Sequence, residues 1–368
     1  RKMIFLLIKK WFSRHDRTKL RVVKALVIAA ILNLVFGLGF YLAERSVQPD
    51  LTLIDSIWWA MVTMTTVGYG DYYAQTWAGR FLVSYPSFIV GIGLLGYLLA
   101  ALAEGIVQRI SNRQKGLMKI KDQNHLIICN CPQGDKLTQL LRELRAVERY
   151  KDTIMVLVTD VFDEIPPELS KHHLRFVKGR PTSEEVLHQA NVSHCEGVFI
   201  LPADITDPNS DAQSFATGSI IESISDETGR EIRTIVELVS KDNLKMLQRS
   251  RTDSIIQTDS LKESLLVQEY LYPGICLAFE QLSSNQAGSQ FYIIKNKLNG
   301  VRFQDAQIAA IKHPARLQIV GIIQSGVPVL TPPSGTVIQT EDALLVIAEN
   351  ERDFIGIEAD ILALSQNS

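Results

Sequence analysis

One short segment with two closely spaced glycines carries the clearest chemistry in the sequence: TTVGYGD, residues 65–71. To pass a dehydrated cation, a protein must replace the ion's water by oxygen ligands, and successive backbone carbonyls do so when they all point inward. The glycines supply the backbone freedom that such alternating dihedral angles need, and a threonine hydroxyl adds one more oxygen. The segment predicts a cation site formed by Thr66, Val67, Gly68, Tyr69 and Gly70. The same letters also make an ordinary turn in a soluble protein.

Two long apolar segments on either side favour the cation site over the turn. Residues 25–43 contain one amide and no charge, and at about 1.5 Å per residue they extend about 28 Å, close to the thickness of a bilayer core. A signal peptide is the alternative for this segment, but its apolar region should be shorter. Residues 81–106 begin with an uncharged run of 23 residues and are also long enough to cross. Between them, residues 54–64 predict a short buried helix whose partial negative end points at the ion path.

Charge distribution predicts how these segments lie in a membrane. Nine of the first 24 residues are Lys or Arg, whereas the formal net charge of all 368 residues is -2. Further basic residues follow the second apolar segment, from Arg109 to Lys121. The positive-inside rule therefore places both termini in the cytoplasm of a multi-pass cell-membrane protein. Residues 1–24 are expected to lie along the inner bilayer surface, and no nucleic-acid partner is expected, because nothing basic follows in quantity.

The TTVGYGD segment between two spans resembles the selectivity filter of potassium channels. The resemblance implies a homotetramer around one ion path, with potassium ions as the transported substrate. In such channels the second span bends at a glycine to open the pore, and the candidates here are Gly91 and Gly93, with Gly96 beyond them. Close helix packing is an equally good reason for these small residues. Glu104 is expected either to join a carboxylate ring at the cytoplasmic mouth or to be a solvated helix end.

The rest of the chain alternates short apolar strands with amphipathic helices. After a predicted linker over residues 107–121, this alternation predicts a parallel, doubly wound, Rossmann-like domain over residues 122–279. Residues 280–368 contain short strands separated by Pro and Gly, and they predict a small β-rich subdomain. The predicted fold is thus an α-helical membrane pore over residues 25–106, with two transmembrane helices and a pore helix, followed by an α/β domain with a small C-terminal subdomain.

A Rossmann-like unit after a potassium pore resembles the RCK, or KTN, domain that regulates potassium conductance. Within it, the stretch at residues 273–296 and the strand ALLVIAE at residues 343–349 look most like the castor and pollux channels of plants and their bacterial relatives. The resemblance implies a gating ring of RCK domains. An internal start at Met118 would add soluble copies and make an octameric ring.

Two regulatory ligands are compatible with the sequence. A dinucleotide needs glycines in the first strand-helix turn, so that backbone amides reach the pyrophosphate, and residues 130–135 lack that spacing. Asp160 still follows the second predicted strand, where a carboxylate would bind the ribose of an adenine nucleotide, although a helix cap or a solvated acid is the alternative. For calcium, the RCK resemblance implies carboxylates at Asp211 and Glu237. The third position of that set is Val239, which leaves the calcium site incomplete.

Two other residue sets have a simple and a chemical interpretation. Asp204 and Asp207, in the acidic loop at residues 202–209, would either cluster with Asp211 and bind calcium through hard oxygen ligands or stay solvated. Cys129 and Cys131 would share one side of a strand and form a Cys-x-Cys metal site, or they are buried reduced thiols.

Three classes of function fit a membrane protein of this kind. A potassium transporter subunit would repeat the pore unit, which appears once here. A membrane-anchored, nucleotide-dependent oxidoreductase would need an intact dinucleotide turn. The sequence therefore predicts a ligand-gated potassium channel and no enzyme.

Overall fold

The computed structural model describes residues 17–365, apart from residues 133–134, 172, 258, 287, 315–316 and 351–352. The chain divides into two compact units, Arg1–Gln114 and Lys115–Ser368. Most of the interfacial segment predicted over residues 1–24 lies outside the described residues.

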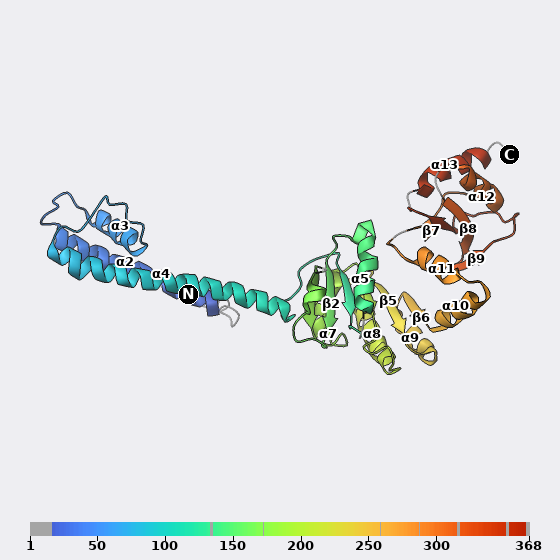
Figure 1. The fold of residues 1–368 in the computed structure, drawn as a ribbon, viewed down its shortest axis with the longest axis horizontal. Helices are drawn as coiled ribbons and strands as arrows, with labels where there is room; N and C mark the ends of the chain where they lie inside the picture. Colours follow the sequence, from blue (N-terminus) through green and yellow to red (C-terminus); the bar gives the residue numbers. More distant parts are fainter. Residues whose placement is uncertain are drawn as a thin grey trace. The chain divides into compact units, whose positions relative to one another are not determined.

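The first unit consists of two long apolar helices and a short one (Figure 1). α2 (Arg17–Glu44) contains the first predicted span, and the second begins as a π-helical segment, η1 (Gly79–Ser84), that continues directly into α4 (Tyr85–Gln114). Both helices are long and apolar enough to cross a membrane, and only 17% and 11% of their most apolar stretches are buried within the chain. The short helix α3 (Leu53–Met64), at the position of the predicted pore helix, packs against both of them.

α4 continues beyond the predicted end of the second span at residue 106 and ends at Gln114. The first half of the predicted linker is therefore helical. Arg, Gln and other polar residues with good helix propensity extend a helix that is already nucleated, even where the apolar pattern that marked the span has ended.

The second unit opens with a six-stranded, wholly parallel sheet in the order β3-β2-β1-β4-β5-β6. The strands are β1 (Leu126–Cys129), β2 (Met155–Thr159), β3 (Leu174–Lys178), β4 (Gly197–Ile200), β5 (Arg233–Leu238) and β6 (Ser254–Gln257). The strand order reverses between β1 and β4, as in a doubly wound Rossmann-like sheet. The predicted α/β fold class of this domain is confirmed.

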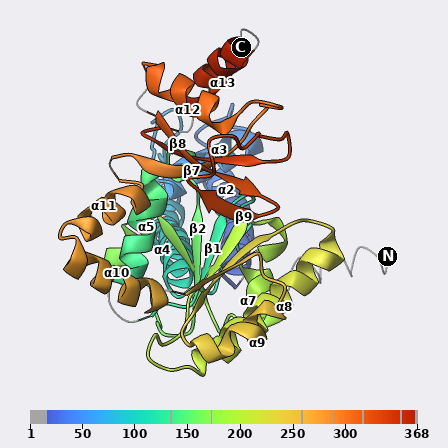
Figure 2. The ribbon, with the colours of Figure 1, turned by 90° about the vertical axis from the view of Figure 1, so that its right-hand side faces the viewer.

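Helices cover both faces of this sheet (Figure 2). One face carries α5 (Lys136–Ala146) and α6 (Pro167–Ser170), and the other carries α7 (Glu184–Gln189), α8 (Ser210–Thr228) and α9 (Leu244–Gln248). Single turns of 3₁₀ helix are η2 (Glu148–Tyr150), η3 (Val192–His194) and η4 (Lys241–Asn243). Because both faces are covered, β1 and β2 are buried at every position, which explains their uninterrupted apolar sequences.

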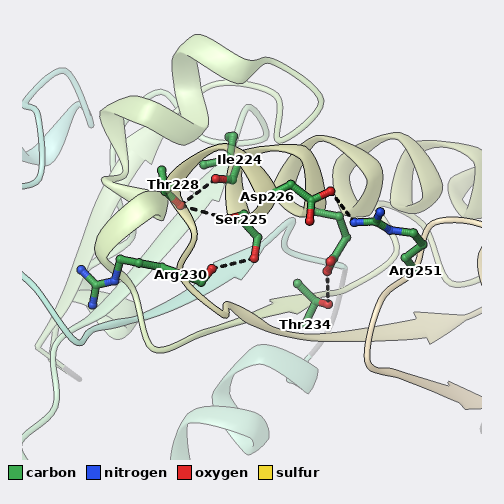
Figure 3. Close-up of polar contacts among 8 residues, drawn as sticks. Ile224, Ser225, Asp226, Thr228, Arg230, Thr234 and Arg251 are labelled. Carbon is green, nitrogen blue, oxygen red and sulfur yellow. Dashed lines mark hydrogen bonds and ion pairs between the residues drawn. The ribbon is translucent and has the colours of Figure 1, made fainter.

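Polar contacts connect the C-terminal part of α8 to Thr234 of β5 and to Arg251, which precedes β6 (Figure 3). The Thr234 hydroxyl donates to Glu222 Oε1 at 2.9 Å, and Arg251 pairs with Asp226 at 2.6 Å. Gly229 ends the helix in the left-handed conformation, with φ of +62°, which glycine adopts without a Cβ penalty.

A helix pair and a second sheet complete the unit. α10 (Asp259–Leu271) and α11 (Ile275–Ser283) precede an antiparallel sheet in the order β7-β10-β8-β9. Its strands are β7 (Gln290–Lys295), β8 (Leu317–Gln324), β9 (Val327–Leu330) and β10 (Ala343–Ala348), and its core includes side chains of α12 (Phe303–Lys312) and α13 (Asp353–Ser365). The subdomain predicted as β-rich is therefore mixed α/β, and the predicted boundary between residues 279 and 280 falls inside α11.

Candidate functional site

The short helix α3 is held against the two long helices by close backbone approach. A Cβ at Gly37 of α2 would lie 2.8 Å from the Cα of Ile57, and a Cβ at Gly91 of α4 would lie 2.5 Å from the carbonyl oxygen of Met64. Real Cβ atoms do not make such contacts, so both positions need glycine for packing.

The start of α3 is fixed by a capping box and an aromatic stack. The Thr52 hydroxyl accepts a hydrogen bond from the Asp55 amide at 3.2 Å, and Asp55 Oδ2 accepts one from the Thr52 amide at 3.1 Å. Further along, the rings of Trp59 and Phe40 stack with centroids 3.8 Å apart. The capping box fixes where α3 begins, and the ring stack holds the helix against α2.

The TTVGYGD segment leaves α3 with an alternating backbone. The φ angle is positive at Thr66 (+62°), Gly68 (+59°) and Gly70 (+79°), and it is not positive at the two residues between them. The amide of Val67 donates to the carbonyl of Val62 at 3.0 Å, which anchors the segment to the helix end. A left-handed threonine costs about 1–3 kcal/mol, so the surrounding contacts must hold it there. Such alternation turns successive carbonyls toward one side, as a cation site made of backbone oxygens needs.

Side chains tie the far end of the segment back to α3. The Trp58 indole donates to Asp71 Oδ2 at 2.8 Å, and its ring lies parallel to that of Tyr69 with centroids 5.9 Å apart. The sequence contained the signal for this pair, an aromatic N–H donor on the helix and a carboxylate after the last glycine, but the pairing needs the folded geometry.

The glycines proposed as a hinge differ in their surroundings. Gly91 has no room for a side chain, whereas no atom of the chain would lie within 4 Å of a Cβ at Gly93 or Gly96. The structure therefore gives Gly91 a packing role against α3. Bending of α4 at Gly91 or Gly93 stays a prediction.

Two carboxylates at opposite ends of the long helices have partners within the chain. Glu44 is fully buried and accepts hydrogen bonds from the amides of Gln75 and Thr76, both at 3.0 Å, so it holds the loop that follows the TTVGYGD segment. No pattern in the sequence predicted this role of Glu44. Glu104 forms an ion pair with Arg21 at 3.0 Å, so a cation of the same chain lies beside its carboxylate.

A cavity of about 380 Å³ lies at the carboxyl ends of the parallel strands, where the strand order reverses. Its polar lining includes Asn130, Asp160, Arg180, Gln213 and Thr217. Arg180 Nε lies 3.0 Å from Asp160 Oδ2. Crevices at this point of an open α/β sheet are the usual ligand sites of the fold. Asp160 thus lines a ligand-sized crevice, and its partner Arg180, next to Gly179, was missed in the sequence.

The first strand-helix turn begins in a conformation that glycine would favour. Asn130, which stands where a nucleotide fingerprint has its first glycine, has φ of +68° and donates from its side chain to the Leu201 carbonyl at 2.9 Å. Asparagine tolerates this left-handed conformation better than most residues. Residues 133–134 of the turn lie outside the described residues.

The residues proposed for calcium have protein partners instead. Asp211 is fully buried, and its carboxylate accepts hydrogen bonds from the amides of Val239 (2.8 Å) and Ser240 (3.0 Å) and from the Asn243 side chain (2.9 Å). Glu237 forms an ion pair with Lys136. Among the residues that the structure describes, no group of three or more His, Cys, Asp or Glu could hold a metal ion. The calcium site stays a prediction without geometric support.

The acidic loop and the cysteines have structural roles here. Asp204 Oδ1 accepts a hydrogen bond from the Thr206 amide at 2.8 Å, and Asp207 Oδ1 accepts one from the Asn209 amide at 2.9 Å, as in ordinary Asx turns. Cys129 is a free, buried thiol in the core of the parallel sheet.

Comparison with known proteins agrees with this arrangement. The family model for ion channels matches residues 28–108, and that for the RCK domain of slowpoke-like calcium-activated potassium channels matches residues 121–240. The putative potassium channel protein YugO of Bacillus subtilis is 25% identical over 330 residues, 87% of this chain and 94% of that protein. The calcium-gated potassium channel TvoK of Thermoplasma volcanium is 24% identical over 325 residues, 85% of this chain and 87% of that protein.

One solved structure shares the fold of part of this chain. The human SLO3 gating ring matches 64% of this chain and 46% of that one, with a TM-score of 0.51 and 18% identity. A GsuK channel bound to NAD matches 90% of this chain and 58% of that one, with a TM-score of 0.47 and 16% identity. The chain thus spans about half the length of these solved chains. With an ion-channel domain followed by an RCK domain, and with potassium-channel relatives along most of its length, the chain has the domain organisation of the prokaryotic two-transmembrane potassium channels that carry a regulatory RCK domain.

Proposed function

We propose that the chain is one subunit of a homotetrameric, potassium-selective channel of the cell membrane, whose opening is controlled by an adenine nucleotide bound in the crevice of the RCK domain. The observation that carries potassium selectivity is the alternation of positive φ at Thr66, Gly68 and Gly70 directly after a helix that is clamped in place. In four copies, the carbonyls of residues 66–70 would replace the water around a potassium ion.

Exposed apolar side chains support the assembly. In the single chain, Val67 and Tyr69 are 53% and 68% exposed, which leaves them free to contact further copies around an ion path. On the helix pair α10 and α11, Tyr270 and Leu277 are 86% and 70% exposed. Large apolar side chains on neighbouring helices are typical of a protein-protein interface, and here they would join RCK domains into a ring of four or eight.

Basic residues support the orientation. Arg21 and Lys24 lie near the start of α2, and Arg109 and Arg113 lie near the end of α4. Because one helix leaves the cytoplasm and the other returns, these cations share the inner side, and both termini are cytoplasmic.

The crevice favours a nucleotide over calcium as the gating ligand. Asp160 can accept hydrogen bonds from ribose hydroxyls, and Arg180 offers a guanidinium to a phosphate. Calcium would have to displace three hydrogen bonds from the buried carboxylate of Asp211. One relative is named as calcium-gated and one solved neighbour is bound to NAD, so both ligands belong in the test.

The test of selectivity is the reversal potential of the purified channel in bilayers with potassium on one side and sodium on the other. A potential near zero would refute the selectivity. Gly68→Ala should abolish selective current, because φ of +59° is strained for alanine. Gly300→Ala is the control, because Gly300 lies outside the pore unit and has a similar φ of +78° with open space around it. This variant should keep the selective current.

The test of the ligand is calorimetric titration of the intact channel with ATP, ADP, NAD and calcium, followed by recordings with each of them on the cytoplasmic side. We expect a nucleotide to bind, and Asp160→Asn to weaken its binding by about tenfold, as for loss of one hydrogen bond to a charged group. Binding of calcium without binding of any nucleotide would refute the nucleotide as the gating ligand.

A further inference from the structure

The segment that follows α4 is attached to the RCK domain almost at once. Gly116, two residues after Gln114, has φ of +64°, and its carbonyl accepts hydrogen bonds from the Lys178 amide at 3.1 Å and from the Gln189 side chain at 2.9 Å. A Cβ at residue 116 would overlap the Lys178 nitrogen and would lie 2.8 Å from the Phe176 ring. Gly116 therefore lies flat against strand β3.

The next residues continue the attachment. Ile120 is 5% exposed and belongs to the core of the parallel sheet, and its amide donates to the Gln189 carbonyl at 2.9 Å. Asp122 pairs with Arg175 of β3 and accepts a hydrogen bond through its carbonyl from the Asn191 side chain at 2.8 Å. The second half of the predicted linker is thus part of the domain, and Lys115 alone separates the end of α4 from the first anchored residue.

The same strand end reaches the crevice. The Lys178 amide holds Gly116, the Gly179 amide donates to the Thr159 carbonyl at 3.0 Å, and Arg180 lines the crevice beside Asp160. The residue that lines the crevice and the residue that holds Gly116 are therefore two positions apart on one chain segment.

We propose that Arg180 is the positioning residue that transmits occupancy of the crevice to the pore, through the contact between Lys178 and Gly116. This inference rests on the proposed function. A ligand with an anionic group and hydroxyls competes for both members of the ion pair, since its anion accepts from Arg180 and its hydroxyls donate to Asp160. The pair is exposed, with 79% and 46% of the two side chains accessible, so a ligand breaks it easily. Arg180 then moves, and the end of β3 carries the anchor of the pore helix with it.

The closing experiment needs no ligand, because Arg180→Gln breaks the ion pair by itself. Open probability is recorded from the full channel in bilayers for the parent, for Arg180→Gln, for Gly116→Ala and for the double variant. In the parent background, Arg180→Gln should change the ratio of open to closed channels by about fivefold for each subunit, which corresponds to about 1 kcal/mol. In the Gly116→Ala background it should change the ratio by less than about twofold, because the contact it acts through is gone.

Gly229→Ala is the matched control. Its φ of +62° imposes the same strain as at Gly116, but no atom lies within 4 Å of the added Cβ, so Arg180→Gln should keep its full effect there. A second variant, a flexible Gly-Ser insert between Gln114 and Lys115, leaves every contact of the domain intact and should also suppress the effect. It covers the case in which Gly116→Ala does not fold.

The results separate the two proposals. No effect of Arg180→Gln on the parent, or an equal effect with and without the insert, overturns the coupling role of Arg180. Nucleotide binding, measured by titration on the same proteins, tests the identity of the ligand independently.

Discussion

Replacing Gly91 by alanine should destabilise the pore unit, whereas the same replacement at Gly93 should not. The new Cβ at residue 91 would lie 2.5 Å from the oxygen, 2.6 Å from the Cα and 2.9 Å from the carbonyl carbon of Met64. All three are backbone atoms, so none can rotate away, and α3 must shift. Overpacking of this kind costs about 1–3 kcal/mol. At Gly93 no atom lies within 4 Å, and alanine gains about 1 kcal/mol in helix propensity.

The two variants should therefore differ by about 2–4 kcal/mol for each chain, from the sum of these two effects. The assay is thermal unfolding of the purified channel in nanodiscs, followed by tryptophan fluorescence, since Trp58 and Trp59 lie on the displaced helix. Single-channel recording of the same proteins gives conductance and open probability. Equal melting temperatures, with only the open probability of Gly91→Ala reduced, would refute the packing argument and establish Gly91 as a hinge.

Three further predictions follow from single contacts. Trp58→Phe keeps an aromatic ring but removes the hydrogen bond to Asp71, worth about 1.5–3 kcal/mol, so potassium currents in sustained recordings should decline faster than those of the parent. Gly79→Ala would overlap the carboxylate of Glu44 and push it off its two amides, so it should lower the melting temperature as Glu44→Gln does, and the double variant should be no worse than either. Burial raises the pKa of Glu143, but hydrogen bonds from the segment after α11 outweigh it and leave this pKa lower than the usual 4.5. The stability that the ionised carboxylate contributes is therefore complete above that usual value and is lost as the pH falls through the lowered one, so Glu143→Gln should destabilise the channel at pH 7 and have little effect in acid, as measured by thermal unfolding at each pH.

The elements that the sequence predicted best are those with a uniform environment. Residues 25–43 and 81–106 are long apolar stretches with little of their surface buried within the chain, and the central strands are covered on both sides, so their apolar runs needed no knowledge of neighbours. The helix α12 was overlooked because its buried face is made of Ala306, Ala309 and Ala310 beside one phenylalanine. Small side chains contribute little to an apolar pattern, although they pack a helix closely onto a sheet.

The parts of the site that the sequence could not predict are long-range pairings. Asp160 was found from its place at the end of a strand, but Arg180 comes from the next strand, and only the strand order brings the two together. Asp211 was proposed as a calcium ligand from the RCK resemblance, whereas in the folded chain its carboxylate accepts hydrogen bonds from the two amides that follow β5. A carboxylate's sequence position does not reveal which donors will surround it.

Cooperation among subunits explains how so weak a contact as the Arg180–Asp160 pair would control a gate. An exposed ion pair contributes about 0–1 kcal/mol, so its exchange for a ligand can bias one subunit by about fivefold at most. If four subunits open together, biases of about 1 kcal/mol each multiply to a change of about a thousandfold in the ratio of open to closed channels. Such multiplication requires that each domain is joined stiffly to its pore helix, because slack would absorb the displacement. Only Lys115 lies between the end of α4 and the hydrogen-bonded Gly116, so little chain is available there to absorb a displacement. In the proposed coupling, the close packing at Gly116 and the weak ion pair at Arg180 are therefore complementary, since the weak pair would let a ligand act and the anchored Gly116 would let its effect reach the pore.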